Sequence, residues 1–585
     1  MPLSACAAAP VLDEKKSARC RFLLGLAAAV FFLAALRGFV SYISANRVTQ
    51  FDDAYMFLRY ARNLLDGRGI CWNPGGPPTF GVSSLLYLFQ IAGLMKITGA
   101  SGSGLLAAAS LANAAAACLV MAASARKIVR LSWLKSFFFL AAVITGGFMI
   151  SVDLRYQARS GMDTTLAMLT NAALVYAGIC LFEKPRARNA VLTAFAAYLT
   201  YLCRSDNFIY ALAFPVLGIL LLQRSGRTRA LLIFAGVFFL LVGLDAAAKG
   251  ALFGDVLPLP AHVKKPGFYV EYFSRYFINP VLIFNSFLLP CFPLFALLLI
   301  GRPLKYWKVA AVFLLPVAVT SVILFNAVQI MGVKGRFYMP GLPFVAAAAL
   351  SVFDKSFEGV RPFSRECLRH FLVRGACVLV LFLAGPPLLD RAQLAVARRQ
   401  NEALYSTPYD LPAYYFLVSK LPGNPNLNTW WSVILTMNQV VEKLPRGALL
   451  AATEDGYISA RNPGLRILDM NGLHEPYIAH HGFSAAYVLD QKPDLIWLPH
   501  WDYIGSIKGF WSLPRFWEDY EYYPRGFRYG IALRKSSPHY AAIKEAVAEG
   551  WPVMHPSVPM ASELTASPEE LRARIDRLAA GGIKR

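Results

Sequence analysis

Long apolar blocks between Phe22 and Leu389 constrain this chain more than any other feature of its sequence. A helix needs ~20 apolar residues to cross the hydrocarbon core of a membrane, so this part has room for roughly a dozen crossings. Of its 585 residues, 56% are hydrophobic and 16% are charged, whereas about a quarter of the residues of soluble domains are charged. The sequence therefore predicts a polytopic α-helical membrane protein and excludes a soluble enzyme, a disordered chain and a fibrous protein.

The blocks predict about eleven membrane-spanning helices. Their expected ranges are 22–45, 105–125, 136–150, 164–182, 190–203, 208–222, 230–248, 277–300, 309–329, 340–352 and 371–389. The apolar segment 83–94 is too short to cross, so we expect it to lie at or dip into the outer interface. The first block could instead be a signal peptide, because it ends on the small residues Ser44 and Ala45, although no clear cleavage motif follows.

The net charge of +23 lies mainly between the apolar blocks. Short loops rich in lysine and arginine are retained on the cytoplasmic side of a membrane, so these loops predict the orientation of the chain. We find no basic face with interleaved aromatic residues, and nucleic acid is therefore not an expected partner. The basic residues between the blocks are Lys15, Lys16, Arg19, Arg21, Arg126, Lys127, Arg130, Lys135, Lys184, Arg186, Arg188, Arg224, Arg227, Arg229, Arg302, Lys305, Lys308, Lys355, Arg361, Arg365, Arg369 and Arg374.

In this orientation the chemically unusual residues fall on the outer side of the membrane. The first outer loop, residues 46–104, contains Asp52 and Asp53, and Asp53 is a plausible N-cap of a short amphipathic helix lying along the membrane. Each charged residue could merely cap a helix or anchor a span, but charges near hydrocarbon are costly unless they are paired or functional. Their common placement at one rim therefore indicates a site. Its other members are Asp163, Arg204, Asp206, Asp255, His262, Lys264, Lys265, Lys334, Arg336 and Tyr338.

Three regions are expected along the chain: a cytoplasmic tail over 1–21, a transmembrane domain over 22–389 and an extracytoplasmic α/β domain over 390–585. Within the last region we expect helices at 403–421 and 567–580, and strands at 448–453, 465–470, 494–499 and 529–534. Aromatic residues of this domain could stack on sugar faces or belong to its core, and these are Trp430, Trp431, Tyr520, Tyr522 and Tyr523.

Cysteine and histidine spacing indicates neither disulfides nor a metal site. Of nine cysteines, Cys71 alone is clearly expected outside, and the region after Asp390 has none. Six of the eight histidines follow Asp390, including His480 and His481, but no HxxxH or carboxylate spacing supports ligation. We also find no P-loop, no Gly-x-Gly-x-x-Gly after a strand and no HExxH motif, so nucleotide-sugar use is not indicated.

One segment of the first outer loop resembles a known family. The sequence FDDAYMFLRYARNLLDGRGICWNPGG is similar to the first outer loop of GT-C-type membrane glycosyltransferases, especially the group that contains the cell-wall terminal β-(1→2)-arabinofuranosyltransferase. Shorter matches run through most of the chain, in TFGVSSLLY, SGMDT, CRSDN, FGDVLPLPAHVKK and ATEDGYISARNPGLRILDMNGLHEPYIA. The chain lacks the family's proline in GVSSLL and its Asn-Thr in LPLP, so the sugar and the acceptor stay open.

The resemblance implies a GT-C fold and a transfer reaction. A polyprenyl-phosphate sugar would be the donor, and an extracytoplasmic glycan or glycolipid the acceptor, at the lipid surface of a bacterial inner membrane. It places the catalytic base within Asp52 and Asp53, with Asp53 favoured, and makes Asp163 a second acid that orients substrate or binds a divalent cation. Candidate phosphate-binding residues are Arg204, Lys264, Lys265 and Arg336. Candidate substrate-binding residues are Tyr55, Arg59, Trp72, Asp206, His262 and Tyr338.

Two other classes of protein stay open from the residues alone. A transporter or flippase with an outer capturing domain would also be polytopic, but such proteins tend to carry internal repeats and broken helices, and we find no obvious repeat. A non-catalytic assembly scaffold would not need Asp52, Asp53 and Asp163. Whether transfer inverts or retains the anomeric configuration depends on carboxylate separations that a sequence does not contain.

Overall fold

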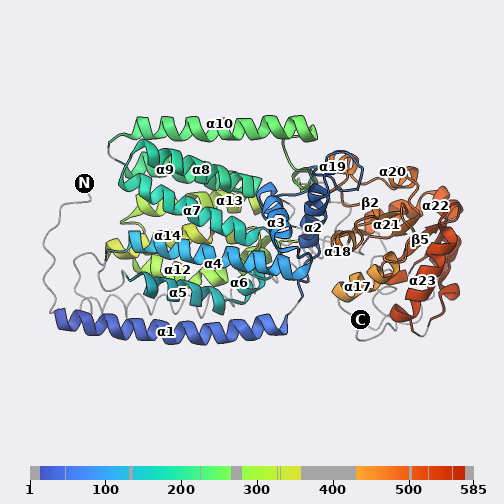
Figure 1. The fold of residues 1–585 in the computed structure, drawn as a ribbon, viewed down its shortest axis with the longest axis horizontal. Helices are drawn as coiled ribbons and strands as arrows, with labels where there is room; N and C mark the ends of the chain where they lie inside the picture. Colours follow the sequence, from blue (N-terminus) through green and yellow to red (C-terminus); the bar gives the residue numbers. More distant parts are fainter. Residues whose placement is uncertain are drawn as a thin grey trace.

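The computed structural model describes residues 14–356 and 430–573, apart from 47, 131–135, 224, 265–279, 326, 328, 330, 500–502, 525 and 557. Figure 1 shows two parts, a bundle of long helices and a smaller α/β domain at one end of the bundle. The bundle helices are α1 (Glu14–Ala45), α4 (Ser103–Ile128), α5 (Phe137–Ile150), α7 (Thr164–Glu183), α8 (Ala187–Cys203), α9 (Phe208–Leu222), α10 (Arg227–Phe253), α12 (Pro280–Ile300), α13 (Trp307–Phe325) and α14 (Leu342–Ser356).

Ten of the predicted spans lie wholly or largely within the described residues, and each of them overlaps a helix. Eight helical stretches there are long and apolar enough to cross a membrane by length and composition. The predicted spans 136–150 and 190–203 correspond to α5 and α8, which have 14 and 17 residues and are shorter than those eight stretches. The predicted span 371–389 lies outside the described residues. The architecture is thus a largely helical membrane protein, with fewer full-length candidate spans than we expected.

The centre of the bundle contains α7 and α14, and its flanks are apolar. Among the candidate spans, the stretch Val333–Ser356, which contains α14, has 94% of its most apolar window buried and α7 has 67%, whereas α1 and α10 have 17% each and lie along opposite sides of the bundle (Figure 1). Large side chains such as Phe22 on α1 and Leu232 on α10 are exposed. Apolar surface of this extent is stable in hydrocarbon and not in water, which agrees with a membrane location.

Short helices cover the end of the bundle that faces the α/β domain. They are α2 (Asp52–Leu65), α3 (Leu85–Thr98), α6 (Val152–Gln157), η1 (Ser205–Asn207), α11 (Leu259–Val263), η2 (Val333–Gly335) and η3 (Met339–Gly341). The predicted interfacial helix at 83–94 is α3. The predicted N-cap Asp53 is wrong, because α2 begins at Asp52 and Phe51 is its N-cap. Most side chains of α2 are buried, since α3 packs on one side and α18 of the α/β domain on another.

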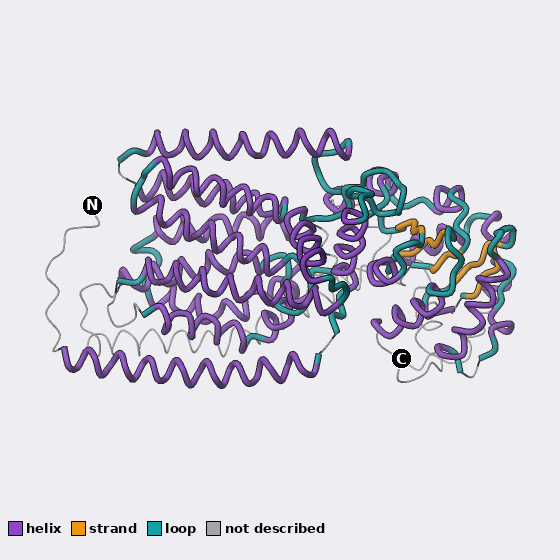
Figure 2. Tube along the Cα trace, in the orientation of Figure 1, coloured by secondary structure: helices purple, strands orange, loops and turns teal. Residues whose placement is uncertain are grey.

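A five-stranded mixed sheet, orange in Figure 2, forms the core of the C-terminal domain. Its strand order is β2-β1-β3-β5-β4. The strands are β1 (Leu449–Ala452), β2 (Arg466–Asp469), β3 (Leu495–Trp497), β4 (Tyr520–Tyr523) and β5 (Ile531–Arg534). Strand β1 pairs parallel with β2 and β3, in register Leu450 with Ile467 and Leu495, while β5 pairs antiparallel with β3 and β4. The four predicted strands are therefore present, and β4 is an additional edge strand.

Helices surround this sheet on both sides. They are α17 (Trp430–Val441), α18 (Gly456–Arg461), α19 (Pro476–His481), α20 (Ala485–Asp490), α21 (Ile504–Trp511), α22 (Pro514–Asp519), η6 (Gly526–Arg528), α23 (Tyr540–Met554) and η7 (Met560–Glu563). The tyrosines of β4 and Trp431 are buried, so they belong to the core and do not form a sugar-stacking surface. The predicted helix at 403–421 lies outside the described residues.

The two parts share one hydrophobic core. Phe51, Tyr55 and Trp72 of the first outer loop belong to the same cluster of buried residues as Ile458 and Ile467 of the α/β domain. Burial of apolar surface contributes about 25 cal/mol per Å², so a continuous core of this kind stabilises a fixed arrangement of the domains. The α/β domain therefore covers the loop that carries Asp52 and Asp53.

Candidate functional site

A cluster of charged side chains lies at the end of the bundle beneath the α/β domain. Its three acids are Asp53 on α2, Asp163 just before α7 and Asp206 in η1. Its three cations are Arg204 at the end of α8, Lys264 at the end of α11 and Arg336 between η2 and η3. These residues come from five separate segments of the chain, since Arg204 and Asp206 are two residues apart, and we call them the charged cluster.

Asp163 is the buried centre of the charged cluster, with no exposed side-chain surface. Its carboxylate pairs with Arg204 Nη1 at 3.2 Å and Arg336 Nη2 at 3.5 Å, and it accepts a hydrogen bond from Ser83 Oγ at 3.2 Å. Burial acts to raise the pKa of Asp163, but the two arginines and Ser83 outweigh it and lower the pKa. Asp163 is therefore negatively charged at neutral pH and holds both guanidinium groups in place.

Arg204 forms ion pairs with two acids, Asp206 and Asp163. Its Nη2 lies 2.6 Å from Asp206 Oδ2 and its Nε donates to Asp206 Oδ1 at 3.0 Å, which is a bidentate pair. Burial alone would lower the pKa of Arg204, but Asp206 and Asp163 raise it. The structure thus makes Arg204 and Asp206 partners of each other within the cluster. Because these donors of Arg204 are already used, it has fewer free to bind a phosphate.

Asp53 is the acid of this cluster that is both partly exposed and weakly paired, whereas Asp206 keeps 34% of its side-chain surface exposed but forms a bidentate pair with Arg204. Its Oδ2 lies 3.5 Å from Arg336 Nη1, a loose contact, and its side chain keeps 21% of its surface exposed, against 4% for Arg336. A carboxylate that is partly accessible and weakly engaged is suited to act on another molecule. Arg336 in turn has its Nε buried without a hydrogen-bond partner among the described residues.

Lys264 and the two arginines surround one aromatic ring. Lys264 Nζ lies 5.0 Å from the centroid of Phe337, and the guanidinium carbons of Arg204 and Arg336 lie 5.3 and 5.4 Å from it. The face of an aromatic ring attracts cations, so Phe337 helps three like charges to share a small volume. Burial and the neighbouring Arg336 lower the pKa of Lys264 to about 8. A bound anion would relieve this repulsion.

Asp52 and Asp53 have different surroundings despite being neighbours. Asp52 is 2% exposed, and its two carboxylate oxygens accept hydrogen bonds from the backbone N–H groups of Gly456 and Tyr457 at 2.8 and 2.7 Å. These N–H groups belong to the first turn of α18, which an acid stabilises. Asp52 therefore joins the two domains, and among the pair it is Asp53 that reaches the charged cluster.

Three predicted substrate-binding residues of the first outer loop are buried in the junction between the domains. Tyr55 stacks on Trp431 with ring centroids 5.8 Å apart, and Trp72 stacks on His474 at 3.8 Å. Arg59 donates hydrogen bonds to the carbonyl oxygens of Trp72, Ser459 and Leu465 at 2.7, 3.0 and 2.7 Å. Substrate binding by these residues is not supported, because the α/β domain covers all three.

The remaining predicted residues lie in several places. Tyr338 is buried in the bundle, where it accepts a hydrogen bond from Gln329 Nε2 at 2.6 Å and packs on Phe284, so it is a core residue. His262 of α11 lies 2.7 Å from Asp255, outside the charged cluster. Lys334 pairs with Asp153 at 3.3 Å. Lys265 lies outside the described residues.

Sequence reasoning missed three members of the site, Phe51, Ser83 and Phe337. Arg336 lies 5.2 Å from the ring centroid of Phe51, so this ring and Phe337 flank the same guanidinium. Ser83 stands in the TFGVSSLLY motif and Phe337 directly follows Arg336, so their positions beside recognised residues were the available signals. Neither a lone phenylalanine nor a lone serine indicates a site without its neighbours in space.

One part of the chain matches a known protein family. The model of a family described as a domain of unknown function (DUF8728) matches residues 428–547, which run from the start of α17 into α23. No curated protein matches the chain significantly. The C-terminal domain therefore resembles a recognised unit whose description assigns no activity, and the match does not include the charged cluster.

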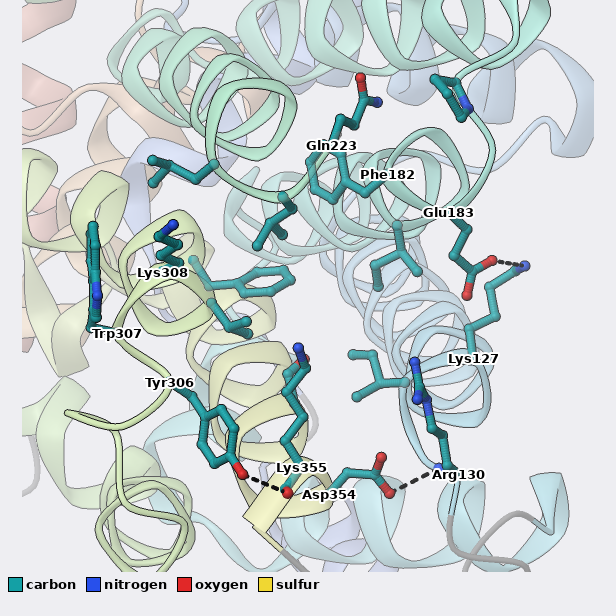
Figure 3. Close-up of a pocket in the computed structure, with 18 of the residues that line it drawn as sticks. Lys127, Arg130, Phe182, Glu183, Gln223, Tyr306, Trp307, Lys308, Asp354 and Lys355 are labelled. Carbon is teal, nitrogen blue, oxygen red and sulfur yellow. Dashed lines mark hydrogen bonds and ion pairs between the residues drawn. The ribbon is translucent and has the colours of Figure 1, made fainter. Parts of the chain in front are cut away.

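A cavity of about 760 Å³ lies at the end of the bundle away from the α/β domain. Figure 3 shows residues that line it. It is bordered by the ends of α4, α7, α9, α13 and α14. Lys127 pairs there with Glu183 at 3.4 Å, and Tyr306 donates a hydrogen bond to the carbonyl oxygen of Lys355 at 2.8 Å. The basic residues of this cavity are those of the predicted cytoplasmic loops, namely Lys127, Arg130, Arg227, Lys305, Lys308 and Lys355.

Proposed function

We propose that this chain is a GT-C-type membrane glycosyltransferase that transfers a sugar from a polyprenyl phosphate to an extracytoplasmic glycan or lipid acceptor. The observation that carries the proposal is the placement of Asp53, partly exposed, beside the buried Arg336 of the charged cluster. The resemblance of the first outer loop to that family supports the same chemistry, with a pentose such as arabinofuranose or a hexose as the sugar.

The charged cluster contains the groups that such a reaction needs. A carboxylate must take the proton of the acceptor hydroxyl as the bond to the sugar forms, and Asp53 is the partly exposed carboxylate of the cluster that is not held in a bidentate pair. Cations must stabilise the phosphate that leaves with the lipid, and Lys264 and Arg336 border Asp53. Asp163 holds Arg336 and Arg204 in position, which keeps these charges fixed during the reaction.

The proposed location is a bacterial inner membrane with the site outside the cytoplasm. The basic cavity and the charged cluster lie at opposite ends of the bundle, and short basic loops favour the cytoplasmic side. This orientation puts Asp53 and the α/β domain on the outer side, where a lipid-linked sugar and a glycan acceptor would meet.

The proposal is tested by incubating the purified full chain with a panel of polyprenyl-phosphate sugars and measuring loss of the donor. Asp53→Asn should reduce turnover about 100-fold or more, because it removes a general base. Asp66→Asn is the matched control, since Asp66 ends the same helix but is exposed and paired with Arg68 at 3.5 Å. Normal turnover by folded Asp53→Asn protein would refute the assignment. Donor that crosses vesicle membranes without being consumed would favour a flippase instead.

A further inference from the structure

Two histidines and an aspartate from distant parts of the chain meet at the junction between the domains. Asp255 follows α10, His262 lies in α11, and His480 lies in α19 of the α/β domain. One ligand atom from each residue lies within 4.8 Å of the other two. Asp255 Oδ2 is 2.7 Å from His262 Nε2 and 3.6 Å from His480 Nε2, and the two imidazole rings have centroids 4.4 Å apart.

This arrangement matches the ligand set of a zinc-type ion. Two imidazole nitrogens and one carboxylate oxygen are common zinc ligands, with bonds of about 2.0–2.2 Å and tetrahedral geometry. Ligand atoms around such an ion are roughly 3.3 Å apart, as those bond lengths and angles require. The distances of 2.7 and 3.6 Å from Asp255 Oδ2 bracket this value, so small side-chain rotations would bring all three groups onto one ion.

The surrounding backbone orients the carboxylate for this role. Asp255 Oδ1 accepts a hydrogen bond from the Leu257 backbone N–H at 3.0 Å, which leaves Oδ2 directed toward the histidines. Hydrogen bonds to the outer atom of a ligating group are a usual feature of metal sites, because they fix its orientation. The packing of α11 against α19 brings the two histidines together.

We propose that Asp255, His262 and His480 bind one divalent transition-metal ion, of which Zn²⁺ is the type that these ligands favour. A fourth position remains for water or another ligand. The ion would link the loop after α10 to the α/β domain. That loop also carries Lys264, so the ion would hold the domain closed over the charged cluster. This proposal does not depend on the glycosyltransferase activity, because the ion would bind and stabilise the chain whatever the reaction.

The test uses the purified full chain after removal of metals with a chelator. Wild-type protein should take up one Zn²⁺ per chain in a calorimetric titration, and Co²⁺ should give the visible absorption of a low-coordinate site. His480→Asn and His262→Asn should each weaken Zn²⁺ binding by about 100-fold or more. Zn²⁺ should raise the melting temperature of the wild type and not of these variants.

His481→Asn is the matched control. His481 is adjacent in α19, but its Nδ1 lies 3.0 Å from the Tyr477 carbonyl oxygen and its ring stacks on Tyr477, and it is not part of the group of Asp255, His262 and His480. This variant should bind Zn²⁺ like the wild type. The proposal is overturned if wild-type protein binds no Zn²⁺, or if folded His480→Asn or His262→Asn protein binds it as tightly as His481→Asn does. Circular dichroism and gel filtration show which variants are folded.

Discussion

Adjacent residues of one helix can have unrelated roles, and Asp52 and Asp53 illustrate the reason. Successive residues of an α-helix point about 100° apart, so two neighbours face different surroundings. Asp52 meets the backbone N–H groups at the start of α18, whereas Asp53 meets Arg336. The sequence marked the pair as unusual because two acids stand close to apolar blocks. Only the segments packed on each side decide which acid is structural.

The buried Asp455 should make the stability of the folded protein depend on pH. This residue is fully buried, and neither carboxylate oxygen has a hydrogen-bond partner among the described residues. Burial raises the pKa of Asp455 well above its usual value, and the nearby Asp469 and Asp52 add to the effect. The folded state therefore keeps a proton that the unfolded state loses above about pH 4. Stability should fall as pH rises, by up to about 1.4 kcal/mol per pH unit for this group.

Asp455→Asn removes this titration because its amide carries no ionisable proton. We measure the melting temperature in detergent. As the pH rises from 5 to 8, we expect the melting temperature of the variant minus that of the wild type to increase. Asp490→Asn is a control at an exposed acid that pairs with Arg515 at 2.6 Å. A difference between Asp455→Asn and the wild type that stays constant over this range would show that Asp455 is already ionised in the folded protein.

At the scale of elements, the junction of α2 and α18 explains why the first outer loop was only partly understood from its sequence. The apolar spacing of α2 predicts an amphipathic helix with one face in the membrane interface. The structure buries α2 on several sides, because α18 returns from a part of the chain about 400 residues away, as the separation of 404 between Asp52 and Gly456 shows. Local periodicity cannot reveal a partner so distant in sequence.

Asp52→Ala should loosen this junction. The change leaves the N–H groups of Gly456 and Tyr457 without their acceptor, and an unsatisfied buried donor costs about 1–3 kcal/mol. We expect a lower melting temperature in detergent and faster proteolysis between the domains. Asp66→Ala, at the exposed end of α2, should change neither. Equal protease resistance of Asp52→Ala and wild-type protein would mean that the shared core alone holds the domains together.

At the scale of the whole molecule, two groups of charged residues are separated along the length of the bundle. The basic cavity lies at one end, and the charged cluster and the α/β domain lie at the other (Figure 1). Charged groups at both ends of long apolar helices can stay in water while the helices cross the hydrocarbon core. The separation therefore gives a direct test of the proposed orientation.

Single cysteines placed at the two ends should differ in their access to an impermeant maleimide added to intact cells. Gln491→Cys in the α/β domain should react, and Ser225→Cys in the loop before α10 should react only after the cells are opened; both positions are exposed. Protein without added cysteine gives the background, which Cys71 should barely raise because it is buried. The opposite labelling pattern would contradict the proposed topology and with it the outer location of Asp53.

The sequence by itself determined the helices of the bundle and four strands of the α/β domain. Both follow from the apolar content of continuous segments, which is a local property of the chain. It also singled out the charged residues of the rim, because charge near hydrocarbon must be paired or functional. Tertiary structure decided their partners. The charged cluster and the group of Asp255, His262 and His480 each join segments that are far apart in sequence, and only packing sets the distances between such side chains.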